Sequence, residues 1–186
     1  SVNNLAEFIQ KQWSGIDIVV ANAGGGSGVP DPMPDHEQWD YSWSANFDTS
    51  LITARAFFPI LESSSGVLLF VSSIAGLEAL GAAVAYSTAK AAVVAFAKNL
   101  SHNAVGKVRV NVFAPGNIKF LGGAWQEKIE KGLHKVDAFI KSKVPMKRFG
   151  TPDEIADAEV FLCSVRASLI TGAVLVVDGG QTVGVS

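Results

Sequence analysis

Residues 15–24 read GIDIVVANAG, and this stretch indicates the class of fold. Its unbroken run of isoleucine and valine is typical of a short strand that is buried on both faces of a sheet. The glycines that follow do not form a dinucleotide-binding fingerprint. Gly24 and Gly26 supply the first pair of Gly-x-Gly-x-x-Gly, but the third place falls on Val29. The stretch therefore predicts a strand over 17–22 and a glycine-rich turn, which alone could be a ligand-binding turn or a plain exit from the strand.

Apolar runs of the same kind recur along the chain and alternate with helical patterns. Further strands are expected over 66–73, 108–116 and 173–180. The spacing of apolar residues, together with a capping signal at Thr151 and Pro152, predicts helices over 1–13, 36–61, 86–103, 124–132, 134–142 and from 152 onward. Continuous apolar strands that alternate with helices indicate a single α/β domain, in which helices cover both faces of a parallel sheet.

Two of these helices carry more specific expectations. The first places four large side chains on one apolar face, namely Leu5, Phe8, Ile9 and Trp13. The helix over 36–61 contains Pro59, which removes a hydrogen bond and is expected to kink or end it.

The composition excludes several classes of function. The chain has 186 residues and a net charge of -2, too small to favour nucleic acid or a membrane surface as partner. No apolar run reaches the ~18 residues that a membrane-spanning helix needs. The single cysteine, Cys163, excludes an intrachain disulfide and fits a reducing, cytoplasmic compartment. His36, His102 and His134 lack the spacing of metal ligands, so no metal site is expected.

Three residues near the carboxyl ends of the expected strands could carry chemistry. Parallel sheets bind ligands at this edge, where Ser73 closes the second strand. Tyr86 and Lys90 are four residues apart on one helix and so share a face. A lysine ammonium favours the phenolate and would lower the tyrosine pKa from about 10, which suits proton transfer in carbonyl–alcohol interconversion. The same pattern also fits an exposed helix pair beside a serine at the end of a strand.

Several ordered motifs together resemble the short-chain dehydrogenase/reductase family over essentially the whole chain. The matching stretches are ANAG (21–24), Asn46, SSIAG (72–76), YSTAK (86–90), APG (114–116), RFGTPDEIA (148–156) and ITGAVLVVDGG (170–180). The resemblance implies the carboxyl-terminal portion of a doubly wound, parallel-sheet Rossmann fold. It also implies an oxidoreductase that uses NAD or NADP to interconvert a secondary alcohol and a ketone. The substrate would then be a small molecule, more consistent with an apolar ketone than with a sugar.

The resemblance also implies roles for individual residues. Tyr86 would be the general acid/base, Lys90 would lower its pKa and hold the nicotinamide ribose, Ser73 would polarise the substrate oxygen, and Asn46 would hold a water that links Lys90 to solvent. Two further groups would contact the cofactor: Asn22, Ala23 and Gly24 after the first strand, and Pro115, Gly116 and Ile118 around the nicotinamide.

Compared with the family, the chain is expected to lack the glycine-rich phosphate turn, which lies upstream of the Asn-Ala-Gly motif. The residue that distinguishes NAD from NADP would be absent with it, and strand 17–22 would lie at the edge of the sheet, unpaired on one side. One explanation is a fragment of a full enzyme. The other is a short chain that covers its edge with a partner, and such a chain could be a non-catalytic binding or assembly module.

The segment 117–145 departs from the family pattern, since Phe120 stands where members often have a cofactor-contacting threonine. Its apolar residues fit a substrate lid or, equally, ordinary helix packing; they are Phe120, Leu121, Trp125, Val136 and Phe139. The resemblance further implies a homo-oligomer, a dimer or tetramer built on the helices over 36–61 and 86–103.

Overall fold

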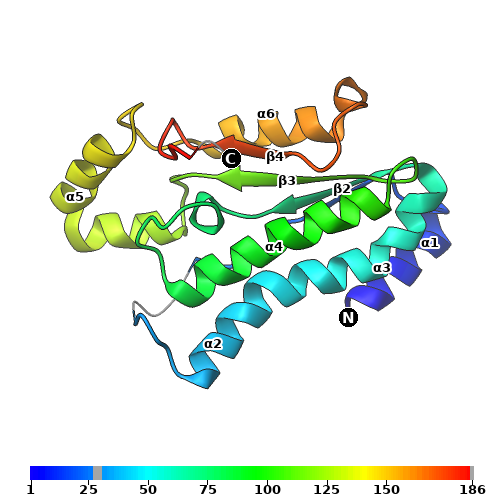
Figure 1. Ribbon diagram of the computed structural model, residues 1–186, viewed down its shortest axis with the longest axis horizontal. Helices are drawn as coiled ribbons and strands as arrows, with labels where there is room; N and C mark the ends of the chain where they lie inside the picture. The colour runs from blue at the N-terminus through cyan, green and yellow to red at the C-terminus, as the bar shows by residue number, and fades with distance from the viewer. Residues whose placement is uncertain (27–30, 185–186) are drawn as a thin grey trace.

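A computed structural model describes residues 1–26 and 31–184 of the chain. Its centre is a parallel four-stranded sheet in the order β1-β2-β3-β4 (Figure 1). The strands are β1 (Ile18–Ala21), β2 (Val67–Val71), β3 (Arg109–Pro115) and β4 (Val174–Val177). The α/β class and the parallel sheet expected from the apolar runs are thus confirmed. Gly28 and Val29 of the opening motif lie outside the described residues.

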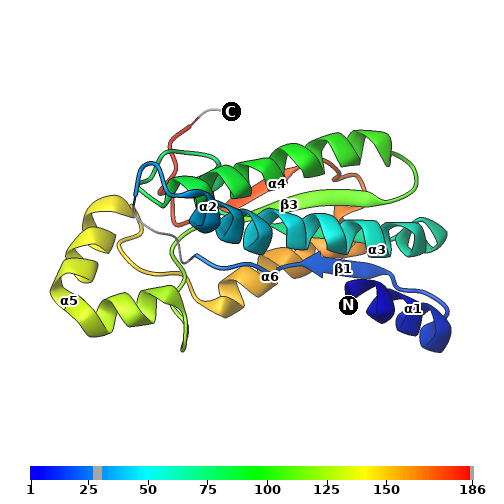
Figure 2. The same ribbon diagram turned by 90° about the horizontal axis from the view of Figure 1, so that it is seen from below.

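Helices cover the sheet on both faces. One face carries α1 (Val2–Trp13), α3 (Thr49–Ser64) and α4 (Val84–Asn103), and α6 (Pro152–Cys163) lies on the other (Figures 1 and 2). Two short 3-10 helices complete the connections, η2 (Ile74–Gly76) and η3 (Val165–Ala167). None of the helices in the described ranges is long and apolar enough to cross a membrane.

The central strand β2 shows why the apolar runs predict the sheet. All five of its residues are buried. Leu68 and Phe70 join the core beneath α3 and α4, whereas Leu69 and Val71 join a second core beneath α6. Because successive side chains of a strand point to opposite faces, only an unbroken apolar run fits this position.

The edge strand β1 is covered on one face only. Val19 and Ala21 are buried, while Ile18 and Val20 remain 44% and 41% exposed. The position of this strand at the edge of the sheet agrees with the expectation from the sequence.

The prediction of one apolar face on α1 is partly wrong, because most of its large side chains are not buried. Ile9 is buried, but Leu5, Phe8 and Trp13 are exposed. The reason is geometric: α1 packs against α3, and in the described part of the chain no other helix covers its remaining apolar side chains.

The helix expected over 36–61 is a composite. It consists of α2 (His36–Trp43), a π-helical turn η1 (Ser44–Asp48) and α3. Pro59 does not end it, since α3 continues to Ser64. Phe57 and Leu61, on either side of the proline, are buried in the core. We attribute the continuation to this packing, which offsets the hydrogen bond that proline cannot make.

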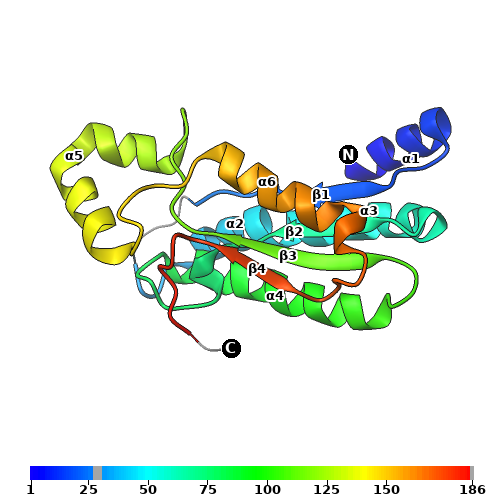
Figure 3. The same cartoon turned by 90° about the horizontal axis from the view of Figure 1, so that it is seen from above.

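Beyond the carboxyl ends of the strands lies α5 (Ala124–Lys143), whose two limbs form a bent arm (Figure 3). The bend lies at Gly132, whose backbone is not helical, in line with the two helices expected here. The start of α6 is also confirmed: Thr151 caps the helix and Glu154 completes a capping box.

Candidate active site

Asn46 lies in the π-helical turn and holds the chain that follows β1. Its side chain is 1% exposed. The amide Nδ2 donates to the carbonyls of Gly25 and Ser42, at 3.1 and 3.0 Å, while Oδ1 accepts from the Gly25 N–H at 3.1 Å. This pairing fixes the glycine turn against the helix. π-helical turns are rare in proteins, and those that occur are frequently found at functional sites.

Lys90 is buried beside the same turn. It is only 5% exposed, and its ammonium Nζ donates to the Val71 carbonyl at 3.0 Å. A Cβ placed on Gly24 would lie 2.9 Å from Asn46 Oδ1 and 3.2 Å from Lys90 Nζ, so the turn approaches both groups closely. Burial lowers the pKa of Lys90 to about 8, because the charged form loses hydration.

Tyr86 lies one helical turn before Lys90 on α4. The Lys90 ammonium is 5.9 Å from the centre of the tyrosine ring. Burial raises the pKa of Tyr86 above its ordinary value of 10, and hydrogen bonding with the Ser73 side chain acts in the opposite direction. The expected lowering of this pKa is therefore not seen, since the desolvation of the phenolate outweighs it.

The segment after β2 packs tightly against α4. The Ser72 hydroxyl donates to the Lys90 carbonyl at 2.8 Å, and the Ser73 hydroxyl accepts from the Ala75 N–H at 3.1 Å. A Cβ on Gly76 would lie 2.7 Å from the Lys90 carbonyl carbon, so only glycine allows this contact. These contacts fix α4, and with it Tyr86 and Lys90, relative to Ser73.

The residues expected around the nicotinamide lie at the carboxyl end of β3 and directly after it. Pro115 pairs with Val177 in the last register position of the sheet. The Gly116 N–H donates to the Val177 carbonyl at 3.0 Å, and a Cβ on Gly116 would lie 2.6 Å from the Asp178 Cα. Ile118 forms an isolated parallel bridge with Gly150.

Asn22, Ala23 and Gly24 are exposed, as a surface for a ligand requires. Among the expected residues, the structure thus groups Gly24, Asn46 and Lys90 around the first turn, and Ser73 with Tyr86 beside them.

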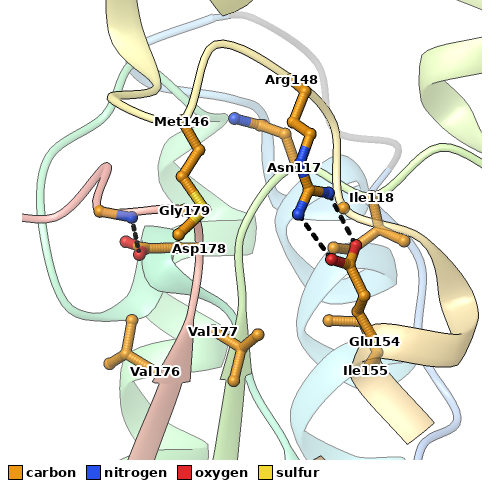
Figure 4. A pocket seen from close by; sticks show the side chains of 12 residues that line it. Asn117, Ile118, Met146, Arg148, Glu154, Ile155, Val176, Val177, Asp178 and Gly179 are labelled. Carbon is orange, nitrogen blue, oxygen red and sulfur yellow. Dashed lines mark hydrogen bonds and ion pairs between the residues drawn. The ribbon is translucent and has the colours of Figure 1, made fainter.

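A cavity of about 350 Å³ lies next to Ile118 (Figure 4). Its lining includes Asn117, Ile118, Gly150 and the ion pair between Arg148 and Glu154, but none of Ser73, Tyr86 and Lys90. The cavity therefore adjoins the expected nicotinamide segment without containing the candidate acid/base group.

Three contributors were missed in the sequence. The Thr49 hydroxyl shares its proton between the carbonyls of Ala23 and Ala45, at 3.1 and 3.0 Å, and so links the turn after β1 to the helix. Arg148 pairs with Glu154, and the Asp178 carboxylate accepts from the Gly180 and Thr182 N–H groups. The sequence pointed to the Arg148–Glu154 pair and to Asp178, because these residues lie within the RFGTPDEIA and DGG motifs. It gave no indication of Thr49. In the described part of the chain no cluster of His, Cys, Asp and Glu could hold a metal.

Comparisons with known proteins identify relatives of this chain. A family model described as enoyl-(acyl carrier protein) reductase matches residues 1–182. The 3-oxoacyl-(acyl-carrier-protein) reductase FabG of Chlamydia muridarum is 36% identical over 178 residues, which cover 91% of this chain and 67% of the relative. Short-chain dehydrogenase/reductase SDRA of Arabidopsis thaliana is 34% identical over 180 residues, which cover 96% of this chain and 68% of the relative. The chain thus spans about two thirds of these relatives.

A solved structure extends the likeness to the fold. L-sorbose reductase from Gluconobacter frateurii, complexed with NADPH and L-sorbose, superposes with a TM-score of 0.87 at 29% identity. The match covers 97% of this chain and 72% of the reductase. The family match over nearly the whole chain, the relatives and the shared fold show that the chain belongs to the short-chain dehydrogenase/reductase family.

Proposed function

We propose that this protein is an NAD(P)-dependent oxidoreductase that interconverts a secondary alcohol and a ketone. The observation that carries the proposal is the grouping of Ser73, Tyr86 and Lys90. The Ser73 side chain lies close enough to Tyr86 to lower its pKa, and the ammonium of Lys90 lies 5.9 Å from the centre of the tyrosine ring. A tyrosine, a lysine and a serine so arranged can bind a carbonyl oxygen and transfer a proton to it.

The roles follow from the donors that the fold provides. The bound nicotinamide supplies or accepts the hydride at the substrate carbon. In the reduction of a ketone, the Tyr86 hydroxyl donates its proton to the substrate oxygen, and the Ser73 hydroxyl hydrogen-bonds to the same oxygen. The high pKa of Tyr86 keeps the phenol protonated at neutral pH, which suits this direction. In the oxidation of an alcohol, the proton returns to the phenolate.

The remaining residues complete the proposed site. Lys90 would donate to the ribose hydroxyls of the cofactor, and the turn at 22–24 and the segment 115–118 would lie along it. The Asn46 side chain already uses both N–H groups of Nδ2 and one lone pair of Oδ1 in hydrogen bonds to Gly25 and Ser42. A water held by Asn46 would therefore donate to the second lone pair of Oδ1.

The segment 117–145 would act as the lid. Trp125 stacks on Phe139 at 5.7 Å and Val136 is buried, so these three favour the packing interpretation, whereas Phe120 and Leu121 are exposed and available to a ligand. From the sequence we also infer a homo-oligomer in the cytoplasm.

The two tyrosines of the chain provide a matched test. Tyr86→Phe removes the proposed acid/base, and Tyr41→Phe removes the same atom from an exposed position on α2. Binding of NADH and NADPH would be followed by tryptophan fluorescence, and turnover measured on a panel of cyclic and acyl ketones.

Tyr86→Phe should bind the cofactor as the wild type does but lose at least about 100-fold in kcat, the scale of general acid–base catalysis. Tyr41→Phe should be unchanged. Wild-type turnover in Tyr86→Phe would refute the role of Tyr86. A folded wild-type protein that binds neither nucleotide would instead favour the non-catalytic alternative.

A further inference from the structure

Three consecutive residues between α5 and α6 connect three different parts of the molecule. Arg148 pairs with Glu154 of α6, Phe149 packs on Trp125 of α5, with ring centres 5.4 Å apart, and Gly150 pairs with Ile118. This short segment, residues 148–150, is therefore a junction between the two helices and the chain that follows β3.

Gly150 holds the chain after β3 by two backbone hydrogen bonds. Its N–H donates to the Asn117 carbonyl at 3.0 Å, and its carbonyl accepts from the Lys119 N–H at 3.1 Å. A Cβ on Gly150 would lie 2.7 Å from Ile118 Cδ1, so the two segments are in close contact. Residues 116–119, here called the nicotinamide loop, are thus fixed on this side through Gly150.

The position of Gly150 is in turn held by an ion pair that brackets it in the sequence. Arg148 donates from both terminal nitrogens to the Glu154 carboxylate, at 2.8 and 2.6 Å (Figure 4). Glu154 Oε2 also accepts from the Thr151 N–H at 2.9 Å. One carboxylate therefore binds both Arg148, the first residue of the junction, and Thr151, the residue that follows its last. A two-pronged pair of this kind restricts orientation as well as distance.

We propose that the Arg148–Glu154 ion pair is a positioning device that holds the nicotinamide loop in place for the cofactor. The proposal rests on the function proposed above, because only a nucleotide-binding site gives the loop its ligand. Arg148 acts through Gly150 and is a positioning residue. The pair is available throughout the neutral range: hydrogen bonding to Arg148, the largest cause, together with the Thr151 N–H, lowers the pKa of Glu154 to about 2.

The test compares two variants of Arg148 with a control variant in which a different ion pair is broken. Arg148→Met removes the pair but leaves the capping box of α6 intact, since Thr151 and Glu154 still bond to each other. Arg148→Lys keeps the charge but loses the planar two-pronged geometry. Lys107→Met is the control, because it breaks a comparably exposed ion pair, with Glu62, at the opposite end of the sheet.

Two measurements separate the loop from the function. Hydrogen exchange reports the N–H groups of Lys119 and Gly150 without any ligand, and fluorescence titration gives the Kd for NADH and NADPH. Arg148→Met should exchange faster at both amides and bind the better nucleotide up to about fivefold more weakly, because an exposed ion pair contributes only a small free energy. Arg148→Lys should lie between it and the wild type, and Lys107→Met should match the wild type.

Unchanged exchange in Arg148→Met would overturn the proposal at its first step. Faster exchange with unchanged Kd would overturn the positioning role and leave the proposed function standing. Absence of nucleotide binding by the wild type itself would overturn both together. A melting temperature that falls without any change in Kd would show a merely structural pair.

Discussion

Replacing Gly24 with alanine tests the closest approach in the candidate site. The new methyl group would lie 2.9 Å from Asn46 Oδ1 and 3.2 Å from Lys90 Nζ, whereas ordinary contact begins near 3.4 Å. The methyl group is thus about half an ångström too close to the amide oxygen. Gly26 offers a matched control, since a methyl group there meets no atom of the described residues within 4 Å.

The magnitude follows from how little Asn46 can yield. Its side chain is buried and makes three hydrogen bonds, so relief requires moving the turn and stretching the bonds to Gly25. Overpacking of this kind costs about 1–3 kcal/mol. In a domain of this size 1 kcal/mol lowers the melting temperature by about 2–4 °C.

Thermal and urea unfolding of both alanine variants would measure this cost, with turnover assayed alongside. Gly24→Ala should melt several degrees below the wild type and lose more activity than its stability alone explains, because the Lys90 ammonium must also move. Gly26→Ala should stay within about 0.5 kcal/mol of the wild type. If the two variants melt alike, the described approach of the turn to Asn46 and Lys90 is wrong.

Two further predictions concern stability. Thr151→Ala removes the cap of α6 and should lower the free energy of unfolding by about 1 kcal/mol in urea titrations; an unchanged midpoint would contradict the capping role. Lys90→Met should change the pH dependence of stability. The pKa of Lys90 is about 8 in the folded protein and 10.5 ordinarily, so between these values the unfolded chain binds more protons. The wild type should therefore gain on the order of 2 kcal/mol relative to Lys90→Met as the pH rises from 8 to 10, and a constant difference across that range would refute the burial of the charge.

The sheet was predictable because its strands carry unbroken apolar runs. The run over 66–73 predicts β2, although the strand itself is Val67–Val71. The run over 173–180 predicts too long a strand, since β4 is only Val174–Val177. Gly179 and Gly180 adopt positive φ angles that a strand does not allow. The exposed side chains of α1 were not predictable, since the helical pattern shows an apolar face but not what covers it.

Residue spacing alone predicted the grouping of candidate site residues only where they share one element. The spacing of Tyr86 and Lys90 places them on one helical face without knowledge of the fold. The contact of Asn46 with Gly25 joins residues 21 positions apart through a π-helical turn, which no periodicity indicates. The direction of the Tyr86 pKa also required the structure, because burial decides it. The assigned roles of these residues, and the expected lack of the upstream glycine-rich phosphate turn, stay predictions.

The burial of Lys90 is itself an argument about ligand binding. A buried ammonium is costly, and an apolar side chain of similar size would serve stability better. An ammonium has three donors, and among the described residues Val71 is the single hydrogen-bond partner of Lys90 Nζ. The same atom lies near Gly24, whose missing side chain leaves the exposed turn open toward it. Donors that the fold does not use, placed beside an open turn, fit a ligand rich in acceptor oxygens, such as the ribose hydroxyls of a dinucleotide.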